Sequence, residues 1–424
     1  MMKSINDFSS WRYGMFVHYG LFSMLERGEW VMNRERMSPR DLRTLAQDFN
    51  PVHFDANAIC DLAVAGGMRY VNLTTMHHEG FRLYDSELSD FNSKSVCGRD
   101  LVEEFVTAAR ARNLKVCLYH SLNNWSDQPD ACDALESKDA YEEFMGNSFA
   151  RIKELVTRFN PIDVLWYDGW WPFDAEQWKA KQMNAMVRDI QPHILFNGRN
   201  GLPGDFGTPE GHLSTPNPWR PWEACMTLND NWGYHRGDHN WKSPEAVLTL
   251  LSAAAQEQGN LLLNIGPRGD GSIPERSVTI VKEVGDWLSA YGESIYDTDS
   301  FSFGLMARGN HRGDWSHNGP FTLRGNSLYQ LVKCWTGSEL VVAGLSSEVK
   351  KVTLLGRKGE QSCGFNQYEG KVVVSGLPED APDTLCSVLR FDCVDVPGME
   401  LSGGMRIPDA PHPPYDPCPS DIAL

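Results

Sequence analysis

The residues best suited to chemistry lie at positions 163–171, which read Asp-Val-Leu-Trp-Tyr-Asp-Gly-Trp-Trp. Their apolar and aromatic side chains predict a buried strand that ends on the carboxylate of Asp168. Because side chains alternate along a strand, Trp166 and Asp168 share one face. Indole rings stack on the apolar faces of sugars, and a carboxylate beside them can act on a glycosidic bond, so the segment indicates a sugar site. The alternative is that Asp168 only caps the helix that follows.

A second carboxylate is needed if Asp168 takes part in glycosyl transfer, because a retaining glycosidase uses a nucleophile and an acid/base about 5–5.5 Å apart. The glutamates near the ends of predicted strands are Glu29, Glu79, Glu210, Glu223 and Glu257. We rank Glu210 first, because its loop follows the next predicted strand after Asp168 and its glycines let the loop fold over a pocket. Glu257 precedes a strand and is at the wrong end, whereas Glu29 and Glu223 are next in line. The alternative for Glu210 is a solvated surface residue.

The adjacent histidines His77 and His78 raise the question of a metal site. Neighbouring residues on an extended chain point in opposite directions and rarely bind one ion together. The sequence also lacks a His-x-x-x-His pattern on a helix, and the glycine-rich segment 264–271 lacks the Lys-Ser/Thr of a phosphate-binding loop. We therefore predict no metal and no cofactor. The histidines are expected to bind sugar hydroxyls, with a purely structural pair as the alternative.

The elements that must position these residues alternate between strand and helix. Strands are predicted at 14–20, 70–76, 115–121, 163–168, 194–198, 224–228 and 260–266, and helices at 100–113, 138–159, 176–190 and 244–258. This order predicts a parallel sheet, and seven strands over this length suggest a (β/α)₈ TIM-like barrel with one degraded strand. Polar residues follow the strand ends at His18, 74–78, 119–120, Asp168, 197–199 and Asn264. Barrel enzymes keep their active sites on that face.

Beyond about residue 296 the pattern changes to short β-rich segments separated by turns, at 326–335, 338–345, 350–356, 370–377 and 387–394. We expect three parts: a catalytic barrel over 1–296, a C-terminal antiparallel β-sandwich over 297–396, and a Pro/Gly-rich tail over 397–424. The tail is expected to be loose or to lie as an arm on the surface or on a neighbouring subunit. The last of these alternatives implies a homo-oligomer.

The composition excludes several classes of partner. A net charge of −17 over 424 residues argues against nucleic acid and anionic membranes. No run of about 18 apolar residues is present, so no transmembrane helix is expected. The first residues lack the apolar core of a signal peptide, which favours a cytoplasmic protein. The ten cysteines are scattered without a Cys-x-x-Cys pair, which is typical of free buried thiols.

Taken in order, several segments resemble glycoside hydrolase family 29, the α-L-fucosidases, from about Trp11 to about Tyr296. They are Arg-Tyr-Gly-Met-Phe-Val-His-Tyr-Gly at 12–20, Gly-Glu-Trp at 28–30, Thr-Thr-Met-His-His-Glu-Gly-Phe at 74–81, Trp-Glu-Ala-Cys-Met-Thr at 222–227 with Trp-Gly-Tyr at 232–234, and Gly-Asn-Leu-Leu-Leu-Asn-Ile-Gly-Pro at 259–267 with Gly-Asp-Gly-Ser-Ile-Pro-Glu at 269–275. One such block is weakly specific, whereas five in register are strongly so.

The resemblance implies a distorted barrel with a C-terminal sandwich, and retaining hydrolysis without metal. It implies Asp168 as nucleophile and Glu210 as acid/base. The residues expected to bind the sugar are Phe16, His18, Glu29, Trp30, His77, His78, Tyr119, His120, Trp166 and Arg199. Phe16 and Trp166 could wall the methyl group of a 6-deoxy sugar. The chain departs from the family pattern at Met76, where a lysine is common, and at His120, where a second tyrosine is expected.

The resemblance therefore implies a retaining exo-α-L-fucosidase that releases α-L-fucose from fucosylated oligosaccharides or glycoconjugates. One alternative is the same machinery acting on a related sugar such as an α-L-galactoside. Another is a carbohydrate-binding protein that has lost catalysis. The presence of both Asp168 and Glu210 argues against this last reading, because a lectin needs no second carboxylate.

Overall fold

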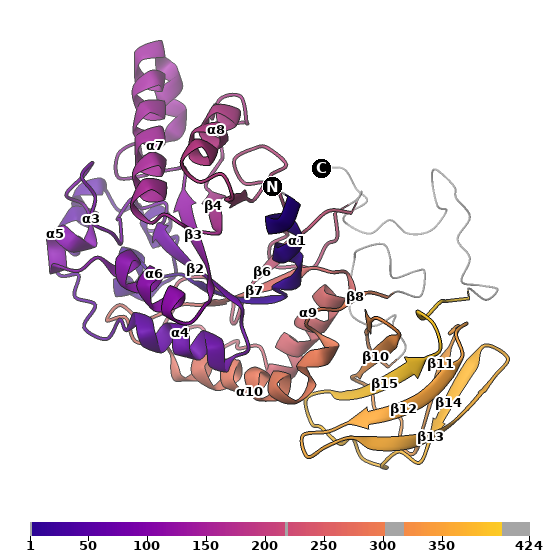
Figure 1. Cartoon of the computed structure of the whole chain (residues 1–424). Helices are drawn as coiled ribbons and strands as arrows, with labels where there is room; N and C mark the ends of the chain where they lie inside the picture. The colour runs from indigo at the N-terminus through magenta and orange to yellow at the C-terminus, as the bar shows by residue number, and fades with distance from the viewer. Residues whose placement is uncertain (1, 217–218, 302–317, 401–424) are drawn as a thin grey trace. The chain divides into compact units, whose positions relative to one another are not determined.

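The computed structural model describes residues 2–216, 219–301 and 318–400 (Figure 1). The chain divides into two compact units. The first contains Met1–His212, Arg220–Val247 and Asn260–Leu288, and the second contains Leu213–Trp219, Leu248–Gly259 and Ser289–Leu424. The boundary expected near residue 296 stays a prediction, and most of the tail expected over 397–424 lies outside the described residues.

The first unit is built on a seven-stranded parallel sheet with the order β5-β4-β3-β2-β1-β7-β6. The strands are β1 (Tyr13–Val17), β2 (Tyr70–Met76), β3 (Lys115–Ser121), β4 (Val164–Asp168), β5 (Leu195–Phe196), β6 (Glu223–Thr227) and β7 (Asn260–Ile265). Nearly every residue in them is buried, as expected for strands covered on both faces. All seven predicted strands are present, which confirms the TIM-like fold.

The eighth position of the barrel is occupied by an irregular segment between the edge strands β5 and β6. Phe206 forms a parallel bridge with Asn197, just after β5. Further along, Gly207 and Glu210 form parallel bridges with Trp222 and Cys225 at β6. These isolated bridges mark a degraded strand. They place Glu210 at the same end of the barrel as Asp168, the last residue of β4.

Helices flank the strands of this unit (Figure 1). They are α1 (Met2–Ser10), α2 (Val31–Arg34), α3 (Pro39–Ala46), α4 (Ala56–Ala65), α5 (Ser93–Cys97), α6 (Leu101–Ala111), α7 (Lys138–Arg158) and α8 (Ala180–Ile190), with the 3-10 turns η1 (Leu21–Leu25) and η2 (Ala131–Glu136). Side-chain caps define several starts: Asp100 accepts from the backbone N–H of Glu103 at 2.8 Å, and Ser137 accepts from that of Ala140 at 3.1 Å. Two further helices, α9 (Pro244–Gln256) and α10 (Glu275–Tyr291), follow β6 and β7.

Aromatic side chains fill the barrel interior at the N-terminal ends of the strands. Phe8 of α1 stacks on Phe206 with ring centroids 4.3 Å apart and meets Trp11 edge-on at 5.0 Å. The side-chain amide of Asn260, the first residue of β7, donates to the carbonyl of Phe8 at 2.7 Å. Helix α1 therefore packs across this end of the barrel.

The second unit contains an antiparallel sheet with the order β11-β14-β13-β12-β15-β10-β9-β8. After η3 (Gly292–Ser294), its strands are β8 (Asp299–Ser300), β9 (Phe321–Arg324), β10 (Ser327–Val332), β11 (Glu339–Ala343), β12 (Val349–Leu355), β13 (Gln361–Tyr368), β14 (Lys371–Ser375) and β15 (Ser387–Cys393). The first part of β13 pairs with β12, and from Gly364 onward it pairs with β14. This change of partner folds the sheet over a shared core that includes Leu340, Val352, Val374 and Phe391. The predicted β-sandwich is confirmed.

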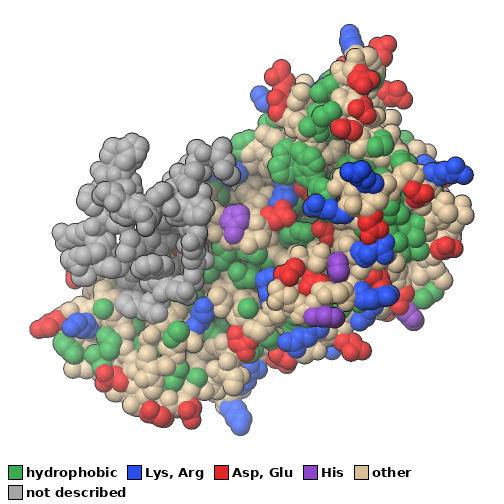
Figure 2. All heavy atoms as spheres, turned by 180° about the vertical axis from the view of Figure 1, so that it is seen from behind, with side chains coloured by type: hydrophobic (Ala, Val, Ile, Leu, Met, Phe, Trp, Pro, Cys, Tyr) green, Lys and Arg blue, Asp and Glu red, His purple; other side chains and the backbone are tan. Residues whose placement is uncertain are grey.

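Several composition-based expectations can be compared with the described residues. The nine cysteines among them are all free. No helix in the described ranges is long and apolar enough to cross a membrane. Acidic and basic side chains alternate over the described surface shown in Figure 2, without a broad basic area on that face.

Candidate active site

A cavity of about 210 Å³ lies at the C-terminal ends of the barrel strands. Its volume is below the roughly 300–1,000 Å³ of pockets for drug-sized ligands, so it suits a single sugar ring. With the exception of His120, every residue predicted to be catalytic or sugar-binding lines it: Phe16, His18, Glu29, Trp30, His77, His78, Tyr119, Trp166, Asp168, Arg199 and Glu210. The other candidate glutamates, Glu79, Glu223 and Glu257, do not line it. The fold thus gathers residues from five strands and their loops around one small space.

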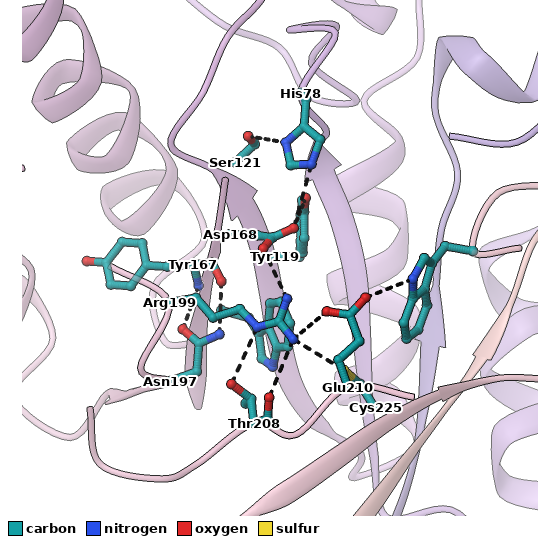
Figure 3. A network of polar contacts seen from close by, with 12 residues as sticks. His78, Tyr119, Ser121, Tyr167, Asp168, Asn197, Arg199, Thr208, Glu210 and Cys225 are labelled. Carbon is teal, nitrogen blue, oxygen red and sulfur yellow. Dashed lines mark hydrogen bonds and ion pairs between the residues drawn. The ribbon is translucent and has the colours of Figure 1, made fainter. Parts of the chain in front are cut away.

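Asp168, the last residue of β4, lies in the wall of this cavity with both carboxylate oxygens bound (Figure 3). The hydroxyl of Tyr119 donates to Oδ2 at 2.9 Å, and Nη1 of Arg199 lies 3.2 Å from Oδ1. Burial, and then the charge of Asp168, raise the pKa of Tyr119 well above its ordinary value, so the phenol keeps its proton and remains a donor. These partners orient the carboxylate and stabilise its negative charge.

Arg199 connects Asp168 to Glu210 (Figure 3). Its Nη2 lies 2.6 Å from Oε2 of Glu210, whose Oε1 accepts from the indole N–H of Trp232 at 3.1 Å. Burial opposes the charge of Arg199, but Cys225, Asp168 and Glu210 outweigh it and raise the pKa of the guanidinium above its ordinary value. A permanently charged guanidinium therefore binds both carboxylates at one side of the cavity.

The hydrogen bonds of His18 and His78 assign their proton positions. Asn264 donates its amide N–H to a carbonyl at 2.7 Å, so its oxygen accepts from Nδ1 of His18 at 2.6 Å. Ser121 donates its hydroxyl to the carbonyl of Asn123 at 2.7 Å, so its oxygen accepts from Nδ1 of His78 at 2.7 Å. Burial, and then the charge on His77, lower both pKa values well below the ordinary one. Both rings are neutral, and Nε2 of His18 is an acceptor for a hydroxyl group. Nε2 of His78 lies 3.8 Å from Oδ2 of Asp168 (Figure 3).

Aromatic rings form the apolar part of the lining. Phe16 and Trp166 meet edge-on with centroids 5.3 Å apart, and the Trp30 ring stacks on Trp171 at 5.7 Å. The guanidinium carbon of Arg199 lies 4.7 Å from the centroid of the Trp166 ring. These flat rings beside polar donors and acceptors match the two kinds of surface that a sugar presents.

Gly169 makes the turn between Asp168 and the rim tryptophans possible. It adopts a positive φ of 66°, and a Cβ there would lie 2.7 Å from Oγ of Ser121 and 3.1 Å from Nδ1 of His78. A larger residue would therefore disrupt the hydrogen bond that orients His78. The glycine is required by both backbone conformation and space.

Four lining residues were not among those singled out from the sequence: Trp170, Trp171, Cys225 and Trp232. Trp170 and Trp171 could have been identified from their position in the sequence, because they directly follow Asp168 and Gly169. Trp232 stands in a block used for the family resemblance. Cys225 lies two residues after Glu223 on β6 and so shares its face, which is the signal that alternation along a strand offers for it.

His120 is the one predicted sugar-binding residue that does not reach the cavity. It is fully buried, and its Nδ1 lies 3.3 Å from the hydroxyl of Thr75. It follows Tyr119 on β3, and strand alternation turns it to the opposite face of the sheet. Burial, and then the charges of Arg151 and Arg82, lower the pKa of this imidazole. We therefore remove His120 from the candidate site.

The alternative glutamates occupy different positions. Glu29 lines the cavity and accepts from the backbone N–H of Gly233 at 2.9 Å. Glu223 lies inside the barrel below the cavity, where Oε2 accepts from Tyr70 at 2.6 Å and Oε1 accepts from the Trp166 indole at 3.0 Å. Burial raises the pKa of Glu223 to about 7, although both hydrogen bonds oppose the shift. Glu223 therefore supports Trp166 from behind and does not face the sugar.

Within the described residues, no group of three or more His, Cys, Asp or Glu side chains could hold a metal ion. His77 pairs instead with Glu79, with Nδ1 lying 3.5 Å from Oε2, and both side chains are buried. The cavity lining therefore offers carboxylates, imidazoles, a phenol and a guanidinium as its chemical groups.

Comparisons with known proteins identify a family, relatives and solved structures that this chain resembles. Residues 2–293 match the family model described as alpha-L-fucosidase. The tissue alpha-L-fucosidase of Bos taurus is 29% identical over 422 residues, which span 89% of this chain and 85% of that protein. Alpha-L-fucosidase isoenzyme 1 from Paenibacillus thiaminolyticus superposes with a TM-score of 0.83 at 31% identity, covering 93% of this chain and 99% of that one.

A second solved structure is a trapped covalent intermediate of a GH29 alpha-L-fucosidase from Bacteroides thetaiotaomicron. It was obtained with 2-fluoro-fucosyl fluoride in a glutamate-to-glutamine variant. It has a TM-score of 0.79 at 26% identity and covers 92% of this chain and 96% of that one. Since the family model spans well over half of the sequence and the fold agrees throughout the barrel, this chain belongs to the α-L-fucosidase family.

Proposed function

We propose that this protein is a retaining exo-α-L-fucosidase that removes α-L-fucose from fucosylated oligosaccharides or glycoconjugates. The observation that carries the proposal is the Asp168–Arg199–Glu210 arrangement in a cavity sized for one sugar. Membership of the α-L-fucosidase family supports the sugar, and the covalent intermediate trapped in a relative supports a two-step mechanism.

In the first step, a carboxylate oxygen of Asp168 forms a bond to the anomeric carbon while the bond from that carbon to the leaving oxygen breaks. Glu210 gives its proton to the leaving oxygen, and the product is a fucosyl ester of Asp168. In the second step, the Glu210 carboxylate takes a proton from water as the water oxygen bonds to the anomeric carbon. The ester bond breaks, and two inversions leave the configuration retained.

The other residues prepare these steps. Tyr119 and Arg199 hold the Asp168 carboxylate in place. The acceptor nitrogens of His18 and His78 bind sugar hydroxyls. Phe16 and Trp166 form an apolar wall for the methyl group that distinguishes fucose from galactose. A polar substituent at this wall would lose its hydration without a partner, so the wall favours the 6-deoxy sugar.

The test is a panel of chromogenic glycosides with wild-type protein and the Asp168→Asn variant. We expect wild type to hydrolyse the α-L-fucoside far better than the α-L-galactoside, and Asp168→Asn to lose nearly all turnover without loss of folding, because only the nucleophile is removed. A variant that retained more than about a tenth of the wild-type rate would rule out Asp168 as a covalent nucleophile. A preference for the galactoside would identify the protein as an α-L-galactosidase with the same machinery.

A further inference from the structure

A second hollow of about 450 Å³ adjoins the sugar cavity. The two share Trp170, Arg199 and Glu210 in their walls. The remaining lining comes from the loop between β5 and the irregular eighth strand, from that strand itself, and from His212 and Arg220. All of these residues belong to the first compact unit. The boundary between the two spaces is therefore the Arg199–Glu210 ion pair with the indole of Trp170 beside it.

If the proposed function holds, the position of Glu210 indicates which part of the substrate occupies this second hollow. An acid/base must lie within hydrogen-bond reach of the leaving oxygen, so the leaving group begins beside the Glu210 carboxyl. The cavity of about 210 Å³ is filled by the fucosyl ring, and the rest of the substrate must lie outside it. The second hollow is the space that adjoins the sugar cavity at Glu210. The indole of Trp170 forms a flat apolar part of its wall.

The charges in the hollow indicate what kind of leaving group it suits. The guanidinium of Arg220 donates to the carbonyls of Pro203 and Gly204, and in the described part of the chain it has no carboxylate partner. The one carboxylate in the wall, Glu210, is already paired with Arg199. In a protein with a net charge of −17, this hollow therefore carries an uncompensated positive charge.

We propose that this hollow binds the leaving group of the substrate and that Arg220 favours a leaving group with an anionic substituent. A carboxylate and a sulfate share the chemistry that Arg220 recognises, because both accept two parallel hydrogen bonds from a guanidinium. The substrate class is thus a fucoside of an acidic sugar or of a similarly charged aglycone. Recognition acts on the ground state and the transition state alike, so it changes KM more than kcat.

The test uses three aryl α-L-fucosides that differ in one meta substituent: carboxylate, sulfonate as the sulfate mimic, and neutral carboxamide. Each is assayed with wild type, Arg220→Gln and Arg220→Lys. The control is Arg112→Gln, which removes the same charge at the other end of the barrel, where Arg112 binds the carbonyl of Ala108 and forms an ion pair with Asp61. Comparing each variant with wild type on each substrate cancels the intrinsic reactivity of the three phenols.

We expect Arg220→Gln to lower kcat/KM for the two anionic fucosides by about two- to tenfold more than for the neutral one, as an exposed charge pair allows. Arg220→Lys should keep most of the anionic preference, Arg112→Gln should leave it unchanged, and added salt should weaken it. An equal loss on all three substrates, or no loss, would overturn the proposal and leave Arg220 with a loop-holding role. A response to only one of the two anions would narrow the class to that anion. Failure of wild type on every fucoside would instead contradict the proposed function.

Discussion

The chemistry of single residues in this protein is set by how each one is paired. Asp168 and Glu210 are both carboxylates, yet their surroundings differ: Asp168 is held by a phenol and a guanidinium, whereas Glu210 is more exposed and bound by Arg199 and an indole. A nucleophile needs to remain charged and fixed. An acid/base needs access to the leaving oxygen and to water, and the exposed position of Glu210 suits that role.

Replacement of Glu210 by alanine tests its role through the leaving group. A sugar alcohol needs a proton to depart, so hydrolysis of a fucosylated disaccharide should fall by about 10²–10⁴-fold. A nitrophenolate departs without help, so the first step on an aryl fucoside should change much less, and the fucosyl-enzyme should accumulate as a burst. Added azide needs no deprotonation and should restore turnover, giving the α-fucosyl azide. Equal losses on both substrates without azide rescue would transfer the role to Glu29, because Glu223 does not reach the cavity.

Several residues of the cavity could be predicted from the sequence because they lie in a recognisable strand or just past its end, where period-two alternation indicates which side chains point inward. The same rule explains the failure at His120, which is adjacent to Tyr119 and must point the other way. The rim residues Trp170 and Trp232 could not be placed this way, since loops have no periodicity that assigns a direction to a side chain.

At the scale of elements, the barrel combines regular strands with one irregular segment that carries Glu210. The regular strands were predictable because they are short segments rich in apolar and aromatic residues. The eighth could not be located, because residues 206–210 contain glycine and proline and make only isolated bridges. Strand β13 was also missed: its residues are mostly polar and exposed, with Gly364 in the middle, so neither alternation nor hydrophobicity marks it.

Glu223 on β6 links three strands, because it accepts hydrogen bonds from Tyr70 of β2 and Trp166 of β4. Its pKa of about 7 in the folded protein exceeds the ordinary value of 4.5, so the folded state binds the proton more tightly than the unfolded chain. The stability that Glu223 contributes is therefore complete below about pH 4.5 and is lost as the pH rises through about 7, by about 3 kcal/mol at most.

The variant Glu223→Gln keeps a hydrogen-bond acceptor but cannot ionise. We expect its free energy of unfolding to fall less than that of wild type between about pH 5 and pH 8, as measured by urea denaturation at several pH values. The control is Glu283→Gln on the exposed side of α10, which should follow the wild-type profile. Parallel profiles for wild type and Glu223→Gln would mean that Glu223 does not titrate in this range.

At the scale of the whole molecule, the residues that line the sugar cavity and the strands of the β-sandwich lie in different parts of the sequence. Every residue that lines the sugar cavity belongs to the first unit. The second unit has its own buried core, in which Phe391 of β15 is fully inaccessible to solvent. The change from strand–helix alternation to short β segments predicted a barrel followed by a β-sandwich, because the two patterns require different architectures.

Truncation of the Phe391 side chain should lower the stability of the second unit without changing the catalytic rate of the folded protein. Phe391→Ala leaves a cavity in the core of the second unit and should destabilise it by about 3–5 kcal/mol. The kcat per active site, counted by titration with a fucosyl inhibitor, should nevertheless equal that of wild type. Val341→Ala on the exposed side of β11 is the control and should change neither quantity. A lower kcat per titrated site in Phe391→Ala would show that the sandwich contributes to the chemistry.

The central claim is that Asp168 becomes covalently bound to fucose, and labelling tests it most directly. The protein is incubated with 2-fluoro-fucosyl fluoride, whose fluorine slows the second step, and is then digested and analysed by tandem mass spectrometry. The account predicts one 2-fluoro-fucosyl group per chain, on Asp168 in the peptide that contains Trp166 and Trp170, and none in Asp168→Asn. A label on another carboxylate, or complete inhibition without any covalent label, would contradict it.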